Sequence, residues 1–420
     1  MTLPNFSQSL EKYAELTVKV GLNLQPGQRL MIGNPTTRGV QLHAAPLVRQ
    51  IALSAYKAGA RYVDVIWGDE ALTRIRFQHA PRDSFQEYSS WHASGMDDIL
   101  KGGDAHLSLR SNNPDLLSDQ DPTSVSVATK THLEQVATFA KGISRNAINW
   151  CVITAAGHDW AARIFPDIAP EERVDKLWED IFAVCRVDLP DPVSAWKEHI
   201  QDLLGRSSFL NEKKFTSLKY KAPGTDLTVG LPEGHRWISA RMSAENGIEF
   251  TANLPTEEMF TIPHKDRTEG TVHASMPLSY SSSLIEDFNL TFEKGRVVKF
   301  SARKGEDVLR RLVETDEGAA RIGEAALVPH NSPVAQRGHL FYDALIDENA
   351  ACHLALGYAF RFNLDGGKAM SDEEFGSHGG NRSLLHADFM IGSGQMDIDG
   401  VHENGITEPI MRNGKWAFDV

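Results

Sequence analysis

Cysteine is scarce in this chain of 420 residues: it occurs only as Cys151, Cys185 and Cys352. An odd and widely spaced set argues against a disulfide framework or a thiolate zinc site, and it fits a reducing cytoplasm. Long apolar runs are missing too, since no stretch of about 18 apolar residues occurs, so we expect no membrane-spanning helix. The N-terminal stretch has neither a basic start nor an apolar core, which predicts no secretory signal and favours a cytoplasmic location.

Positive charge is in deficit. The chain has 43 Lys and Arg against 56 Asp and Glu, which gives a formal net charge of −13. Because phosphate binding relies on Lys and Arg, this balance disfavours a nucleic-acid partner. The excess acid could be solvated surface, or part of it could be gathered in a cation site.

The length exceeds what one ordinary core holds and predicts two domains. In the first half, strand-like runs at 29–33, 61–67, 105–110 and 149–156 alternate with helical patterns, and this alternation is typical of parallel βαβ units. We therefore predict a doubly wound α/β domain over residues 1–206. The turn at 33–39 lacks the glycine spacing of a dinucleotide fingerprint, so no nucleotide cofactor is predicted.

The second half has a different texture. Short β-rich runs at 226–231, 248–255, 270–277 and 289–302 are separated by Gly and Pro, and a helical pattern occupies 305–315. Lys294–Gly295 is predicted to form a hairpin turn. Residues 207–420 are therefore predicted to form a mostly antiparallel α+β domain.

Charged residues occur in this second half where an apolar strand is expected. His386 and Asp388 stand two apart in the run RSLLHADFMIGSG. Residues i and i+2 of a strand face the same side, so these two groups should point into one space. Either they form a satisfied hydrogen-bonded pair, or both bind a metal ion.

Other polar residues in apolar stretches raise the same two alternatives, a structural role or metal binding. His353 lies in an apolar run, Glu324 follows Gly323, and Glu348, Glu257 and Glu258 flank similar segments. Taken singly, each is best explained as a surface or cap acid or as a satisfied core histidine. Taken together, four carboxylates and two histidines form a common ligand set for two divalent ions, whose charge would offset the repulsion among the acids.

Three stretches give this set a family resemblance. NLPTEEMFT (253–261), GEAALVPHNSPV with LFYDALIDENAACHLALG (323–334 and 340–357) and NRSLLHADFMIGS (381–393) resemble the motifs of the M29 aminopeptidases, and the likeness extends over the whole chain. Members of that family are two-metal exopeptidases that remove N-terminal amino acids. The resemblance implies the following metal ligands: Glu258, Glu324, Glu348, His353, His386 and Asp388.

The resemblance also implies roles. Glu324 is expected to be shared between the two ions, which could be Zn²⁺, Co²⁺, Mg²⁺ or Mn²⁺. Glu348 could be a ligand, the catalytic base, or both. The expected substrates are peptides with a free N-terminus, cleaved by a water that the two metals activate, and the expected assembly is a homodimer.

One position departs from the family pattern. Members commonly have tyrosine seven residues after the ligand histidine, where this chain has Phe360. A tyrosine hydroxyl there could stabilise the oxyanion, and phenylalanine cannot. Tyr358 would share a face with Phe360 if the strand continued, and its hydroxyl could substitute after local rearrangement. His378, in the polar Gly-rich stretch that follows, is predicted to be a solvated loop residue.

We therefore predict a metallo-aminopeptidase. Two other functions stay open at the level of sequence. One is a peptide- or metal-binding module with reduced turnover, for which Phe360 is the hint. The other is a two-metal hydrolase of another amide or ester.

Overall fold

The computed structural model describes residues 3–34, 39–111, 113–280 and 283–420, so part of the turn at 33–39 lies outside the described residues. The chain forms two compact units. The first comprises Met1–Glu198 with Arg241–Pro255, and the second comprises His199–Ala240 with Thr256–Val420. The predicted mixture of helices with parallel and antiparallel sheets is confirmed, whereas the domain boundary at residue 206 stays a prediction.

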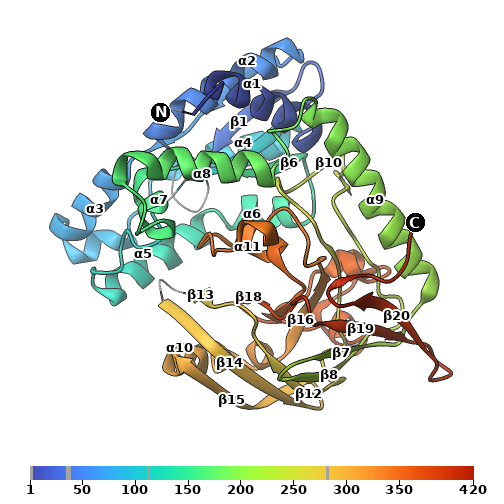
Figure 1. Ribbon diagram of the computed structural model, residues 1–420. Coiled ribbons are helices and arrows are strands. Elements are labelled where there is room, and N and C mark those ends of the chain that lie inside the picture. The colour runs from blue at the N-terminus through green and yellow to red at the C-terminus, as the bar shows by residue number, and fades with distance from the viewer. Residues whose placement is uncertain (1–2, 35–38, 112, 281–282) are drawn as a thin grey trace. The chain divides into compact units, whose positions relative to one another are not determined.

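The first unit is built on a parallel sheet (Figure 1). Its strands are β1 (Arg29–Gly33), β3 (Tyr62–Val65), β5 (Ala105–Arg110) and β6 (Trp150–Thr154), in the order β3–β1–β5–β6. The order reverses at β1, so right-handed crossovers place the helix between β1 and β3 on one face and those between β3 and β5 on the other. This is the arrangement of a doubly wound sheet, and β5 and β6 are almost wholly buried because both faces are covered.

The helices of this unit follow the predicted alternation. They are α1 (Phe6–Leu16), α2 (Ala45–Lys57), α3 (Glu70–His79), α4 (Ser90–Gly102), α5 (Pro122–Gln135), α6 (Ala137–Ser144), α7 (His158–Ile164) and α8 (Pro170–Val184). The helix α9 (Pro192–Lys213) contains the end of the unit. None of the described helices combines the length and the apolar character that a membrane span requires.

The segment Arg241–Pro255 joins this first unit from far along the chain. Val152 donates its backbone N–H to the carbonyl of Ala252 at 2.7 Å, and Leu254 donates to the carbonyl of Val152 at 3.1 Å. The strand predicted over 248–255 is reduced to Glu249–Phe250 (β10), which pairs with Met242–Ser243 (β9). Most of the segment is thus an irregular addition at the edge of β6.

The larger sheet of the second unit has nine antiparallel strands. They are β7 (Ser217–Ala222), β8 (Thr225–Gly230), β12 (Thr268–His273), β13 (Leu278–Tyr280), β14 (Ser283–Glu293), β15 (Arg296–Lys304), β19 (Asp397–Val401), β20 (Thr407–Arg412) and β21 (Lys415–Trp416). The order is β13–β14–β12–β8–β7–β19–β20–β21, with β15 also on β14. The predicted hairpin turn is confirmed, since Lys294 and Gly295 both have positive φ between β14 and β15.

The smaller sheet of this unit has the order β11–β16–β17–β18, and all of its pairs are antiparallel. Its strands are β11 (Met259–Thr261), β16 (Ile322–Leu327), β17 (His353–Gly357) and β18 (His386–Met390). The helices α10 (Glu306–Val313), α11 (Ala344–Asp347) and α12 (Asp372–Ser377) complete the unit. The strand expected around His386 is shorter than the apolar run that predicted it.

Candidate metal centre

The smaller sheet presents four of the six predicted ligands on one face. They are Glu324 on β16, His353 on β17, and His386 and Asp388 on β18. Ala355 of the middle strand lies directly opposite Glu324 on one side and Asp388 on the other. Directly opposed residues of an antiparallel sheet point to the same face, and so do residues two apart along one strand. The register of three strands therefore gathers these side chains.

Small residues separate the charged ones. Ala355 stands between Glu324 and Asp388, and Gly357 lies opposite His386. Gly357 has φ of 109°, and a Cβ at this position would lie 2.0 Å from the carbonyl oxygen of Leu385. Because neither residue projects a bulky side chain, the face retains room between the acids and the imidazoles.

Two clusters of potential ligand atoms result, and they share one residue. Glu258, Glu324 and His353 form the first, and Glu324, His386 and Asp388 form the second, with the donor atoms of each within 4.8 Å of one another. Glu324 Oε1 lies 3.6 Å from His353 Nε2, while Oε2 lies 3.6 Å from His386 Nε2. One carboxylate thus directs one oxygen toward each of the two clusters.

The backbone fixes the orientation of both imidazoles. His353 Nδ1 lies 3.2 Å from the carbonyl oxygen of Ala351, and His386 Nδ1 lies 2.8 Å from that of Tyr358. A carbonyl oxygen only accepts, so Nδ1 carries a hydrogen and donates it. In the neutral ring Nε2 is then a bare lone pair facing carboxylate oxygens, an arrangement that needs a proton or a cation between them. Metal-binding histidines are commonly held in this way.

The titration of the site reflects this demand for positive charge. Burial lowers the pKa of His386, but Asp388 and Glu324 outweigh it and raise the pKa to about 9. Burial likewise opposes protonation of His353, yet the carboxylates of Glu258 and Glu324 beside its Nε2 raise its pKa well above the ordinary value. Burial raises the pKa of Glu324, whereas Asp388 has a lowered pKa because His386 outweighs its burial. The raised pKa values of His353 and His386 show that protons on the two imidazoles would balance part of the negative charge of the acids, as bound cations also could.

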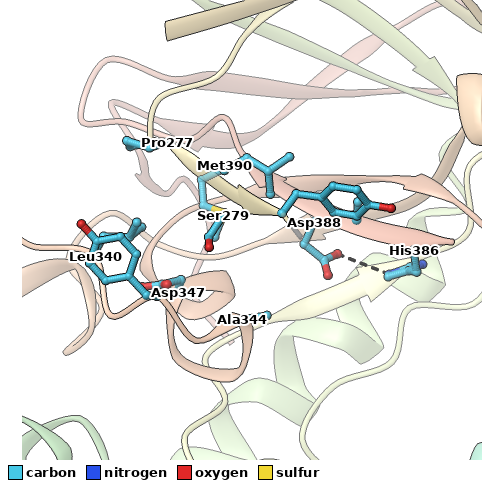
Figure 2. A pocket seen from close by; sticks show the side chains of 12 residues that line it. Pro277, Ser279, Leu340, Ala344, Asp347, His386, Asp388 and Met390 are labelled. Atoms are coloured by element: carbon cyan, nitrogen blue, oxygen red, sulfur yellow. Dashed lines mark ion pairs between the residues drawn. The ribbon is translucent and has the colours of Figure 1, made fainter. Parts of the chain in front are cut away.

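Two buried oxygens show that the residues fit a metal. Glu258 Oε2 lies 3.2 Å from His353 Nε2, and Asp388 Oδ1 lies 3.3 Å from His386 Nε2 (Figure 2). Despite these ion-pair distances, neither oxygen accepts a hydrogen bond of good geometry from the described residues. Carboxylate oxygens and imidazole nitrogens together suit divalent ions such as zinc, cobalt or manganese. The donor set therefore fits a divalent cation.

Glu348, the sixth predicted ligand, lies near the clusters but belongs to neither among the described residues. It stands on a single 3₁₀ turn, Glu348–Ala350, rather than on a strand. Burial raises its pKa well above the usual range, and the charges of Glu258 and Asp388 raise it further. Its carboxyl group therefore binds a proton more readily than an exposed glutamate does.

Two positions around Glu258 add detail that the sequence pattern did not provide. Glu257, its neighbour, is buried and faces His199, with Glu257 Oε2 3.4 Å from His199 Nε2. The backbone N–H of Glu257 donates to Oδ1 of the buried Asn349 at 2.7 Å, and Asn349 Nδ2 donates to the carbonyl of Leu345. Asn349 therefore connects the turn of Glu258 to the turn of Glu348. An isolated Asn or His has no periodic signal, although Asn349 is adjacent to a predicted ligand.

Phe360, which departs from the family pattern, lies just beyond the end of β17. The strand ends at Gly357, so the alternation expected for Tyr358 and Phe360 does not apply. Both rings nevertheless lie beside His386, at centroid distances of 4.7 and 5.1 Å. The pKa of Tyr358 is raised by burial and then by Asp388 and Glu324, which places its hydroxyl in the field of the cluster. His378 is exposed at the end of α12 and lies outside both clusters.

The sequence is similar to that of known proteins along almost its whole length. The sequence profile of the family described as thermophilic metalloprotease (M29) matches residues 6–416. The chain belongs to the M29 family of metalloproteases. The predicted resemblance is thereby confirmed over the whole length rather than over the ligand motifs alone.

Relatives with curated names agree. The chain is 47% identical over 415 residues to Aminopeptidase 2 of Geobacillus stearothermophilus, a match that covers 99% of both chains. It is 42% identical over 412 residues to Aminopeptidase T of Thermus thermophilus, across 98% of this chain and 99% of the relative. The solved structure of wild-type AmpT from Thermus thermophilus superposes with a TM-score of 0.91 at 41% identity, covering 98% of this chain and all of that one. The predicted class of activity, a metal-dependent aminopeptidase, is confirmed by this M29 membership and by these relatives.

Proposed function

We propose that this M29 protein releases N-terminal amino acids from peptides with two divalent ions held on the face of β16, β17 and β18. The observation that supports two ions is the split of Glu324, whose Oε1 faces His353 and whose Oε2 faces His386. Zn²⁺, Co²⁺, Mg²⁺ and Mn²⁺ all suit the donor set. When bound, such ions polarise a carbonyl oxygen and lower the pKa of water at the site.

The ligands are assigned from the two clusters. Glu258 and His353 would hold one ion, His386 and Asp388 the other, and Glu324 both. The contacts of His353 and His386 with backbone carbonyls keep Nε2 of each imidazole directed toward the carboxylates before an ion binds. Asn349 keeps the turn of Glu258 and the turn of Glu348 at a fixed spacing.

Glu348 is assigned the proton transfer. Burial, and then the charges of Glu258 and Asp388, raise the pKa of its carboxyl group. With cations in the site the carboxylate would accept a proton from the attacking water, and the resulting carboxylic acid would deliver this proton to the leaving amine. The Tyr358 hydroxyl, beside His386 and in the field of Asp388, is assigned to the developing oxyanion that Phe360 cannot contact by hydrogen bonding.

The wider setting is also a proposal. We place the protein in the cytoplasm as a homodimer of chains that divide into an N-terminal α/β domain and a C-terminal domain with the ligands. Cys151, Cys185 and Cys352 are all buried and form no disulfide with one another, which is compatible with a reducing compartment. Analytical ultracentrifugation tests the dimer, since it would have twice the chain mass of 46.5 kDa.

A panel of aminoacyl-anilides and short peptides tests the activity, with metal content measured on the same freshly purified protein. Free amino acids should be released from substrates with a free N-terminus and not from their N-acetylated forms. Two equivalents of divalent metal per chain should accompany full activity. Tight peptide binding without turnover would instead identify a binding module. Cleavage of blocked amides or esters alone would identify a hydrolase of another kind.

A further inference from the structure

Three aromatic side chains follow one another beside the metal ligand His386. They come from the segment after β17, where the sequence YAFRF places Tyr358, Phe360 and Phe362 at alternate positions. The ring centroids of Tyr358 and Phe360 lie 4.7 and 5.1 Å from that of His386. The Phe362 ring stacks on Phe360 with a centroid distance of 5.0 Å. These three rings, called the aromatic row below, therefore begin at a metal ligand and continue beyond it.

The residues between the rings hold the segment from the other side. Ala359 packs in a buried apolar cluster that includes Phe375, and the guanidinium of Arg361 lies 4.7 Å from the centroid of the same ring. The buried Phe260 of β11 contacts both phenylalanine rings of the row, at centroid distances of 6.2 and 6.1 Å. Packing within the second unit thus fixes the aromatic row in place.

The aromatic row is nevertheless accessible to solvent. Tyr358 is 37% exposed, and Phe360 and Phe362 are only partly buried. Single exposed apolar residues are common on protein surfaces, whereas a contiguous group of them is typical of a ligand-binding surface. Aromatic rings also attract a further ring in offset-stacked or edge-to-face arrangements. The aromatic row therefore offers a contact surface to an apolar side chain of a ligand.

The other end of the face that carries the metal ligands is closed. A cavity of about 160 Å³ runs along β18 past Asp388 and is bounded by residues 277–280 and 340–347 (Figure 2). Beside it the backbone N–H of Ser275 donates to the carbonyl of Met390 at 2.8 Å, so the two backbones are in direct contact there. Engineered cavities of similar volume hold a benzene ring. This end therefore admits a single side chain and not a continuing peptide chain.

The two ends give the substrate a direction. An enzyme that removes one residue at a time holds a single residue on one side of the scissile bond and a chain of any length on the other. The closed end beyond Asp388 suits the single residue, and the accessible end beyond His386 suits the chain. We infer that the aromatic row binds the side chain of the second residue of the peptide and favours aromatic and large apolar side chains there. This inference rests on the proposed peptidase activity.

Tripeptides that differ at one position test the inference on the wild-type, metal-loaded protein. Leu-Phe-Gly should be cleaved with kcat/KM about 3- to 10-fold higher than Leu-Ala-Gly, the effect expected of one added aromatic contact. The difference should lie mainly in KM, because the contact is made equally in the bound substrate and in the transition state. Equal kcat/KM for the two peptides would overturn the inference.

A change in the protein provides the second test. Phe362→Leu removes one ring of the aromatic row and keeps an apolar side chain against Phe260. The ratio of kcat/KM between Leu-Phe-Gly and Leu-Ala-Gly should fall by about 2-fold or more, whereas leucinamide, which has no second residue, should be cleaved as by the wild type. Phe300→Leu is the matched control, since Phe300 is a partly buried residue of β15 that packs against Arg310. It should leave the ratio unchanged, and an unchanged ratio in Phe362→Leu would contradict the inference.

A third comparison tests the direction of the peptide. Phe-Ala-Gly and Ala-Ala-Gly differ only at the first residue, so the ratio of their kcat/KM values should be the same in the wild type and in Phe362→Leu. A change in this ratio without a change at the second position would place the N-terminal side chain on the aromatic row. The inferred direction would then be wrong.

These outcomes are distinct from failure of the proposed function. If the metal-loaded wild type released no amino acid from any tripeptide or from leucinamide, the peptidase activity itself would be wrong. If it cleaved all of them without regard to the second residue, only the assignment of the aromatic row would fail. Should Phe362→Leu not fold, the comparison of tripeptides on the wild type would still decide.

Discussion

Two histidines turn the same ring nitrogen inward, and each is held by a backbone carbonyl on its outer side. His353 and His386 come from neighbouring strands, yet both use Nδ1 as the anchor and leave Nε2 for the carboxylates. Without an ion the acids hold protons on these rings instead, which is why the pKa of His386 rises to about 9. The two imidazoles and the surrounding carboxylates thus form a site that binds positive charge, either as protons or as metal ions.

Asp388→Asn separates a ligand from a structural partner. The amide keeps the shape of the side chain and can still contact His386, but it removes one of the acids that balance the ions. We expect loss of at least one metal equivalent and a fall in kcat/KM of about 100-fold or more, comparable with loss of a major electrostatic group in an active site. Metal analysis and anilide assays measure both. Glu257→Gln is the matched control, a buried acid in the adjacent turn that pairs with His199 outside the clusters. Full metal content in Asp388→Asn would contradict its assignment as a ligand.

Tyr358→Phe tests the oxyanion donor. Removing its hydroxyl should lower kcat about 10- to 100-fold with unchanged metal content, because the donor contacts only developing charge. Phe360→Tyr in that background offers a hydroxyl from the neighbouring ring, which also lies beside His386, and should restore part of the lost rate. Unaltered kcat in Tyr358→Phe would assign stabilisation of the oxyanion to another group.

Some of these residues are predictable from the sequence and others are not, for physical reasons. His386 and Asp388 were recognisable because residues two apart in a strand face the same side, and burying two charged or polar groups there costs free energy unless they have a partner. Nothing in the pattern TEE separates Glu258 from Glu257; the family motif did, and the structure shows that only Glu258 joins a cluster. His199 and Asn349 act through contacts with partners 57 or more residues apart from them, which no local pattern contains.

At the level of elements, the site depends on how closely β17 and β18 approach each other. Gly357 lies opposite His386, and the carbonyl of Leu385 occupies the place where a side chain would begin. Asn381 Nδ2 also donates to the carbonyl of Gly357 at 2.6 Å. The pair of strands therefore positions His386 through backbone contacts, independently of the metal.

Gly357→Ala should destabilise this strand pair. The added Cβ meets Leu385 O and the backbone φ is positive, so we expect a loss of about 2 kcal/mol or more in the free energy of unfolding, together with lower metal content. Gly405→Ala is the matched control: Gly405 also has positive φ, at 81°, but no atom lies within 4 Å of its added Cβ. It should lose about 1 kcal/mol, from the backbone alone. Denaturant unfolding with chelator present measures both, and equal losses would refute the packing argument.

Element bounds were predictable where apolar periodicity was strong. The strands at 29–33 and 105–110 have the predicted limits, because both faces of a parallel sheet demand apolar residues. The run around His386 predicted a longer strand than β18, since its apolar residue Leu384 is in fact 87% exposed. The short strands β9, β10 and β13 have too few residues for any period to be visible.

For the whole molecule, the division into units exceeds what a local pattern can determine. Arg241–Pro255 lies after the start of the second unit along the chain but bonds to β6 of the first. Periodicity predicts which face of a segment is buried, not which remote strand will bury it. The mixed architecture was therefore predictable, and the return of this segment was not.

Metal should contribute to the stability of the whole protein because the clustered acids are buried in the second unit. Glu258 and Glu324 are buried and Asp388 is partly buried, so these acids lose water on folding and need protons or cations to balance their charge. An ion bound only by the native state raises the free energy of unfolding by about 2.7 kcal/mol at a free concentration 100 times its Kd. We expect chelation to lower the unfolding temperature and abolish peptidase activity together, and zinc, cobalt or manganese to restore both. Calorimetry and anilide assays over a series of free zinc concentrations measure this coupling, and Asp388→Asn should show a smaller zinc-dependent rise. Protein verified as metal-free that kept its unfolding temperature and its full activity would rule out a functional metal centre on this face.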